Sequence, residues 1–126
     1  MKTSSAKAKG RRLQQKVATD IQNDHYLPET DVVSTSMGAG GVDVQMSAKA
    51  IEACPISPEC KNQESLNIWA AMKQAEANCL DGTHPVVVFT RNRSETYATL
   101  PWDSLRQILR ERREYQIAKE TMQGDM

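Results

Sequence analysis

Hydrophobic residues recur along the chain with spacings that predict helices alternating with short strands. Leu13, Val17 and Ile21 repeat at helical spacing, so we expect a first helix over residues 9–24. Short β-branched or alternating segments then predict strands, and the segment between the last two of them predicts a single helical turn. These strands are expected over 31–36, 42–46 and 55–61, and the turn over 47–53.

The second half of the chain continues this alternation. A helix is expected over 67–80, followed by a continuously apolar strand over 85–90 that should be covered on both faces. Another strand is expected over 95–100, and Pro101 should open a final helix. We expect this helix to bury one apolar stripe, and we expect both tryptophans to lie in the core. These residues are Leu105, Ile108 and Leu109 in the stripe, with Trp69 and Trp102.

The predicted order is helix, three strands, helix, two strands, helix. This order predicts an α/β domain in which helices flank one mixed central β-sheet. With 126 residues, the chain has the length of one domain. We therefore expect a single domain over 9–120, between flexible tails over 1–8 and 121–126.

Charge is unevenly distributed, although sixteen basic and sixteen acidic side chains cancel over the whole chain. Residues 1–16 hold six basic side chains and no acid, whereas residues 17–81 hold ten acids and three bases. A uniformly basic nucleic-acid coat is thereby excluded, and the pattern suits a polyanion-binding rim around an acidic centre. An accidental spread of solvated charges is the alternative. No apolar run could cross a membrane and no secretory signal is present, which predicts a cytoplasmic protein without a membrane partner.

Strand parity places three charged residues on one side of the predicted sheet. Asp43 points away from the apolar face of its strand, and Glu59 and Lys61 are two residues apart on the next strand. Two converging carboxylates repel each other unless a hard cation such as Mg²⁺ lies between them. A nearby lysine can orient the attacking water or stabilise charge on a phosphate. This combination suits phosphodiester hydrolysis, and the alternative is a surface ion cluster.

The spacing of these residues, an aspartate followed by Glu-x-Lys, resembles the PD-(D/E)XK nuclease superfamily. Gly41-Val42-Asp43 and Glu59-Cys60-Lys61 carry the resemblance, and the stretches 58–64 and 73–78 extend it toward small phage-type, Holliday junction resolvase-like nucleases. The resemblance implies a restriction-endonuclease-like core. It further implies Mg²⁺ or Mn²⁺ bound by Asp43, Glu59 and the Cys60 carbonyl, a catalytic role for Lys61, and a homodimer that cuts branched or junction DNA. If the chain is phage-encoded, it acts in the host cytoplasm.

Three glutamines bear on this site. Resolvase-like members often carry a glutamate on the first helix, where this chain has Gln14 and Gln15, and either one is a candidate for that place. Gln74 shares a helix face with Asn67, Ala71 and Asn78, and related nucleases use a glutamine there near the catalytic lysine. For Gln74 a catalytic role and a solvent-facing stripe both remain open.

Basic and flexible positions near the predicted site are candidates for contacts with the DNA backbone. The glycine-rich loop before Asp43 could let the backbone approach a phosphate, or it could be an ordinary hairpin turn. Arginines of the last helix are expected on a solvated face or at an oligomer contact. The candidate contacts are Lys7, Lys9, Arg11, Arg12, Ser36, Gly40, Arg91 and Arg93.

Two other functions remain compatible with the sequence. A nucleic-acid-binding protein with a degenerate nuclease fold would bind DNA without cutting it. A nuclease for linear DNA or for RNA would keep the chemistry on another substrate. The three cysteines, Cys54, Cys60 and Cys79, lack the spacing of a zinc site and should be reduced thiols.

Overall fold

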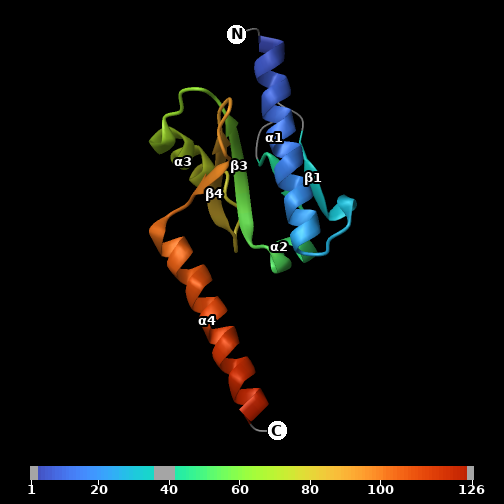
Figure 1. Cartoon of the computed structure of the whole chain (residues 1–126), viewed down its shortest axis with the longest axis vertical. Helices are drawn as coiled ribbons and strands as arrows, with labels where there is room; N and C mark the ends of the chain where they lie inside the picture. Colours follow the sequence, from blue (N-terminus) through green and yellow to red (C-terminus); the bar gives the residue numbers. More distant parts are fainter. Residues whose placement is uncertain (1–2, 36–41, 125–126) are drawn as a thin grey trace.

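The computed structural model describes residues 3–35 and 42–124, and its helices and strands form a mixed α/β structure (Figure 1). In these described residues, four α-helices, one 3₁₀ helix and five strands follow one another in an order close to the predicted one. The coarse α/β class is confirmed. The elements are α1 (Thr3–Asp24), η1 (Glu29–Asp31), β1 (Val32–Ser34), β2 (Val44–Met46), α2 (Ala48–Ala53), β3 (Ile56–Asn62), α3 (Ile68–Ala77), β4 (His84–Thr90), β5 (Tyr97–Thr99) and α4 (Trp102–Gly124).

Both terminal helices are longer than the sequence predicts. α1 begins at Thr3 rather than near Lys9, and α4 continues to Gly124 rather than ending near Glu120. Only half of the added residues are good helix formers, and serine, threonine and glycine make up the rest. Each helix thus continues beyond the apolar pattern that first indicated it.

The single mixed sheet of the prediction is divided into two smaller sheets. β1 and β2 form an antiparallel pair, and β3, β4 and β5 form a second sheet in which β4 is central. β3 pairs with β4 in parallel, and β4 pairs with β5 antiparallel. β2 lies near β3 but does not form a ladder with it. Two residues of β3 explain the break, because Pro58 has no N–H to donate and the Cys60 N–H donates to a side chain.

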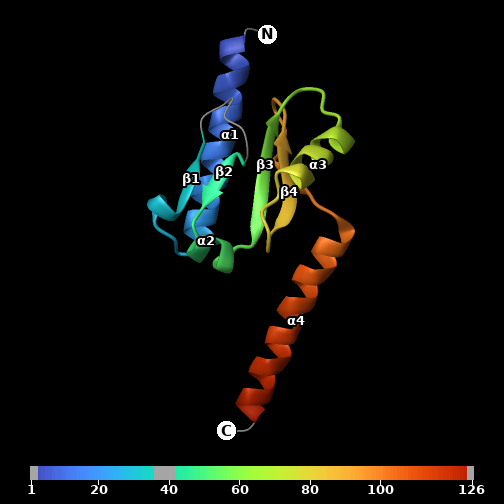
Figure 2. The same ribbon diagram turned by 180° about the vertical axis from the view of Figure 1, so that it is seen from behind.

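Strands β3 and β4 are covered on both faces (Figures 1 and 2). On one face, α1 and the β1–β2 pair enclose a core that includes Leu13, Val32, Val44 and Cys60. On the other face, α3 packs over Val87 of β4. The prediction that the apolar strand β4 is covered on both sides is confirmed.

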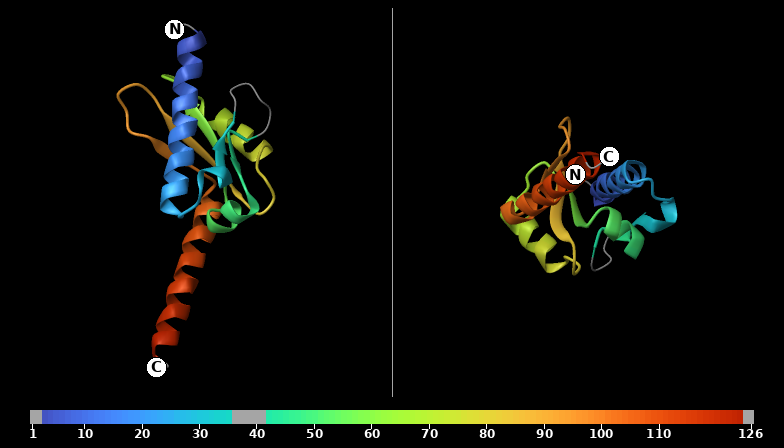
Figure 3. Two further views of the ribbon diagram at one scale, coloured as in Figure 1. Left: turned by 90° about the vertical axis from the view of Figure 1, so that its right-hand side faces the viewer. Right: turned by 90° about the horizontal axis from the view of Figure 1, so that it is seen from below.

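α4 extends away from the rest of the molecule in the side views (Figures 1 and 2, and Figure 3, left). It contains no buried residue, so the predicted burial of the stripe formed by Leu105, Ile108 and Leu109 is wrong. Trp69 and Trp102 are 80% and 69% exposed, and their assignment to the core is wrong as well. Helical periodicity shows which side of a helix is apolar, but it does not show that a neighbour covers that side.

No helix in the described parts of the chain has the length and apolar character that crossing a bilayer requires.

Candidate active site

β3 directs its charged side chains toward α3. Residues 56–62 form a seven-residue strand, and successive side chains point to opposite faces. Cys60 packs in the core beside α1, so Glu59 and Lys61 point to the opposite face. Their partners in β4, Val87 and Phe89, contribute to the core under α3 on that same face. The predicted parity of Glu59 and Lys61 is therefore confirmed.

Asp43 reaches this strand from the segment just before β2. Its Oδ2 accepts a hydrogen bond of 2.7 Å from the backbone N–H of Cys60. This N–H lies on the edge of β3 that faces away from β4, because β4 pairs with the alternate residues of the strand. The N–H and C=O of one residue in an extended strand point to the same edge. The Cys60 carbonyl therefore points toward the edge that Asp43 occupies.

Lys61 connects Glu59 to helix α3. Its Nζ lies 3.7 Å from Glu59 Oε1 and donates a hydrogen bond of 2.8 Å to Gln74 Oε1. The Asn78 side chain, at the C-terminal end of α3, also hydrogen-bonds to Glu59. Gln74 thus contacts the lysine, although its side chain also remains exposed to solvent. The structure brings Asp43, Glu59, Lys61 and Gln74 together.

Burial raises the pKa of both carboxyl groups of this cluster. Glu59 is only 3% exposed, and its burial raises the pKa of its carboxyl group. The negative charge of Asp43 raises that pKa further, against the lowering effect of Lys61 and of the Asn78 hydrogen bond. Burial likewise raises the pKa of Asp43, against its hydrogen bond from Cys60 and the charge of Lys61. The site therefore holds two interacting acids with incomplete charge compensation.

This donor set fits a hard divalent cation. Two mutually repelling carboxylates and a main-chain carbonyl, all oxygen donors, match the ligands that Mg²⁺ and Mn²⁺ prefer. Within residues 3–35 and 42–124, no group of three or more His, Cys, Asp or Glu side chains could hold a metal. A cation bound by Asp43, Glu59 and the Cys60 carbonyl would complete its shell with water and substrate oxygen, as Mg²⁺ commonly does.

The Cys60 thiol itself is not part of this donor set. It is buried in the core beside α1, and burial with the nearby carboxylates raises its pKa to about 12. The thiol stays protonated at neutral pH, whereas a thiolate is the form that ligates metals. Cys54, Cys60 and Cys79 are all free cysteines, in agreement with the prediction of reduced thiols.

The glutamines of α1 lie in different environments. Gln14 is 2% exposed, whereas Gln15 is exposed on the other side of the helix. α1 packs against β3, the strand that carries Glu59. Of the two candidates for the place of a first-helix glutamate, the buried Gln14 is therefore the one on the inner side.

Only some of the residues predicted to contact DNA phosphates lie near the candidate site. Lys9 lies at the end of β3, where its carbonyl accepts a hydrogen bond from Asn62 Nδ2 and where it shares a hollow with Asn92. Arg91 and Arg93 lie on the loop between β4 and β5. Lys7, Arg11 and Arg12 are exposed along α1. Ser36 and Gly40 lie outside the described residues.

Sequence reasoning did not assign roles to Asn78 and Tyr97. Asn78 was visible as part of the polar stripe of α3, one turn after Gln74, and that spacing was the available signal. Tyr97 faces Phe89 across the β4–β5 pair, with ring centroids 5.9 Å apart. Its position depends on the hairpin register, which the sequence did not define.

Comparisons with protein-family models, with curated proteins and with solved structures found no match for this chain.

Proposed function

We propose that this protein is a Mg²⁺-dependent DNA endonuclease with a restriction-endonuclease-like core. The observation that carries the proposal is the position of the Asp43 carboxylate at the edge of β3. There it accepts a hydrogen bond from the backbone N–H of Cys60, the residue between Glu59 and Lys61. Two acids and a lysine meet there, and each acid comes from a separate segment of the chain. In an ordinary surface ion cluster the charged side chains are exposed to water, whereas Glu59 is only 3% exposed.

Each residue of the cluster has a role that its geometry supports. Asp43, Glu59 and the Cys60 carbonyl would hold the cation, which supplies charge stabilisation at the scissile phosphate and activates water. Lys61, held by Gln74 at 2.8 Å, would orient the attacking water or stabilise the developing charge. Lys9, Arg91 and Arg93 would contact backbone phosphates. The preference for branched or junction DNA rests on the sequence resemblance.

A cleavage assay tests this proposal directly. Labelled four-way junction, linear duplex, single-stranded DNA and RNA would be incubated with the full chain, with Mg²⁺ and with EDTA. We expect metal-dependent cutting of the junction, abolished in Asp43→Asn and retained in Asp81→Asn, which changes an exposed aspartate in the turn after α3. Cutting in EDTA, or equal activity of Asp43→Asn, would contradict the metal-site assignment.

The other outcomes of the same assay identify the alternative functions. Equal cutting of junction and duplex, or preferential cutting of RNA, would support phosphodiester hydrolysis at this site but reject junction DNA as the preferred substrate. Salt-dependent DNA binding without cutting in Mg²⁺ or Mn²⁺ would indicate a nucleic-acid-binding protein with a degenerate nuclease fold.

A further inference from the structure

A row of side chains crosses the second sheet beside the proposed active site. Lys61 of β3 is paired in register with Phe89 of β4, and Phe89 is paired with Tyr97 of β5. Register partners in neighbouring strands lie about 4.8 Å apart and point to the same face. Starting at the lysine, the row therefore continues through two aromatic rings toward the sheet edge.

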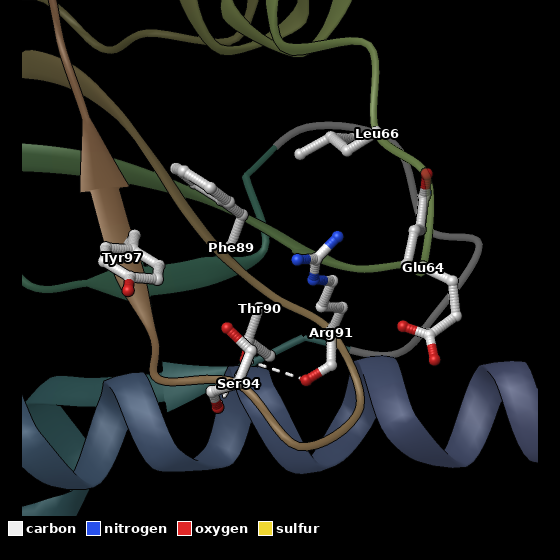
Figure 4. Close-up of a pocket in the computed structure, with 8 residues that line it drawn as sticks. Glu64, Leu66, Phe89, Thr90, Arg91, Ser94 and Tyr97 are labelled. Carbon is white, nitrogen blue, oxygen red and sulfur yellow. Dashed lines mark hydrogen bonds between the residues drawn. The ribbon is translucent and has the colours of Figure 1, made fainter.

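The aromatic end of this row lines a pocket of about 310 Å³ (Figure 4). Tyr97 and Phe89 form one side, and Leu66 and Glu64 lie across from them. The Arg91 side chain points into the space between Phe89 and Glu64. The pocket thus combines exposed aromatic surface, since Tyr97 is 54% exposed, with one cation and several hydrogen-bonding groups.

We propose that this pocket holds one unpaired nucleotide of the substrate, with its base against Tyr97 and its phosphate at Arg91. Every base has a flat face that can stack on an aromatic ring, and a guanidinium pairs well with a phosphate. The Glu64 carboxylate is held in place on the opposite side, where its Oε2 accepts a hydrogen bond of 3.1 Å from the Asn92 N–H. The volume lies at the lower end of the range for small-ligand pockets, which suits a single nucleotide.

This inference rests on the proposed nuclease function and specifies its substrate. A base in continuous duplex is stacked between its neighbours and cannot enter such a pocket. A substrate with an unpaired nucleotide next to the cut, as at a flap, an overhang or an open branch point, provides one. The pocket would therefore select DNA with a locally unpaired strand over continuous duplex.

Fluorescence of 2-aminopurine, which stacking quenches, tests the pocket independently of cleavage. The base analogue would be placed as the unpaired nucleotide of a flap, and the cleavage-impaired Asp43→Asn protein would be titrated onto it. We expect quenching on binding and a loss of affinity of roughly five- to one-hundredfold in a protein that also carries Tyr97→Ala. Tyr97→Phe should keep the affinity, and Tyr26→Ala, which removes another exposed tyrosine, should not change it.

Two results would overturn the pocket assignment. One is the absence of quenching on bound flap DNA, and the other is an equal loss of affinity of Tyr97→Ala for flap and for blunt duplex. Failure of the nuclease proposal has a different signature, because quenching at Tyr97 would persist while the native protein cuts nothing in Mg²⁺. Cutting without quenching would support the nuclease function and contradict the nucleotide-binding role of the pocket.

An independent observation concerns α4, whose apolar residues are at most half-buried in the described structure. None of its residues is buried, and it makes no extensive contact with any described element. Isolated helices are marginal in water, because most helical stability in proteins comes from packing an apolar face. Leu105, Ile108, Tyr115 and Met122, interrupted by Arg112 and Lys119, recur at alternating spacings of three and four, which is the spacing of a helix–helix seam.

We infer that α4 pairs antiparallel with α4 of a second copy of this chain. Four arginines in its first half outnumber the acids there, and in its second half Glu114 and Glu120 outnumber Lys119. An antiparallel pair places these opposite charges side by side, whereas a parallel pair places like charges together. In a pair centred on the helix, Leu105 would lie against Met122 of the partner subunit. Arg112 would lie against Tyr115 of the partner subunit, as a cation–π pair.

Light scattering on the full chain tests this pairing. We expect the mass of a dimer at micromolar concentration, a monomer for Ile108→Glu in the seam, and a dimer for Thr121→Glu outside it. Orientation follows from mixing Leu105→Cys and Met122→Cys proteins, because an antiparallel pair forms the mixed disulfide. A monomer at all concentrations, or a dimer that Ile108→Glu leaves intact, would overturn the pairing. Two homodisulfides would overturn its direction.

Discussion

The two faces of β3 have similar burial and opposite chemistry. On the α1 side, Cys60 joins a core of aliphatic side chains from α1, β1 and β2. On the α3 side, Ser57, Glu59 and Lys61 are also removed from most solvent, but each has polar partners. The difference shows that one strand can contribute stability through one face and hold charges in place through the other. Changes on the first face should affect folding, and changes on the second should affect chemistry.

Lys61 is the position where we expect the largest effect on cleavage together with the smallest effect on folding. Lys61→Met removes the charge on the α3 side and keeps most of the aliphatic volume. We expect cleavage to fall roughly 10²–10⁴-fold, the usual contribution of a positioned acid–base group, while the melting temperature changes little. Single-turnover cleavage and thermal unfolding measure the two quantities. Lys49→Met, at an exposed site of α2, should leave both unchanged.

The opposite result is expected on the α1 side. Leu13→Ala should lower the free energy of unfolding by about 2–5 kcal/mol, because Leu13 is buried in the core that contacts Cys60. The cleavage rate of the folded fraction should remain close to that of the native protein. Urea titration gives the first value, and cleavage well below the unfolding midpoint gives the second. Leu80→Ala, at an exposed leucine, is the matched control. Full stability in Leu13→Ala would show that α1 does not anchor this core.

A smaller effect should appear in the dependence of stability on pH without metal. Burial raises the pKa of Glu59 and of Asp43 above their unfolded values. Between the unfolded and folded pKa values, the native state binds more protons than the unfolded state. The free energy of unfolding should therefore fall as pH rises through that interval and level off above it.

Denaturant titrations in EDTA across this interval measure the fall. Glu59→Gln should reduce it, because the amide does not titrate, whereas Glu76→Gln at an exposed position of α3 should not. Saturating Mg²⁺ should reverse the trend, because the cation binds the ionised carboxylates. A native protein whose stability rises through the same interval would contradict the raised pKa values.

The smallest effect is expected at Cys60, on the α1 side of β3. Its buried thiol, with a pKa of about 12, should react with thiol reagents far more slowly than Cys79 in the folded protein. Mass spectrometry after brief labelling measures the ratio. Rapid labelling of Cys60 in the native state would show that the α1 side of β3 opens.

Local pattern was sufficient to predict much of the fold and part of the site. The two-residue period of a strand placed Glu59 and Lys61 on one face, and helical spacing placed Gln74 on the same face of α3 as Asn78. The division of the sheet was not predictable in the same way. It depends on the Asp43 carboxylate taking the Cys60 N–H, a contact across seventeen positions. The exposure of α4 was not predicted, because an apolar stripe shows which side of a helix favours burial but not whether another element packs against it.

The edge of β3 that faces away from β4 gives Asp43 a second possible consequence, because its carboxylate occupies a backbone N–H of that edge. Open strand edges recruit other strands through unpaired N–H groups, and this recruitment leads to aggregation. Along this edge Pro58 has no N–H, Ile56 donates to Cys54 and Cys60 donates to Asp43. Replacing Asp43 with alanine would free the Cys60 N–H. Asp43 thus occupies an N–H through which this edge could pair with another strand, and asparagine, which keeps an acceptor oxygen, is the substitution expected to keep it occupied.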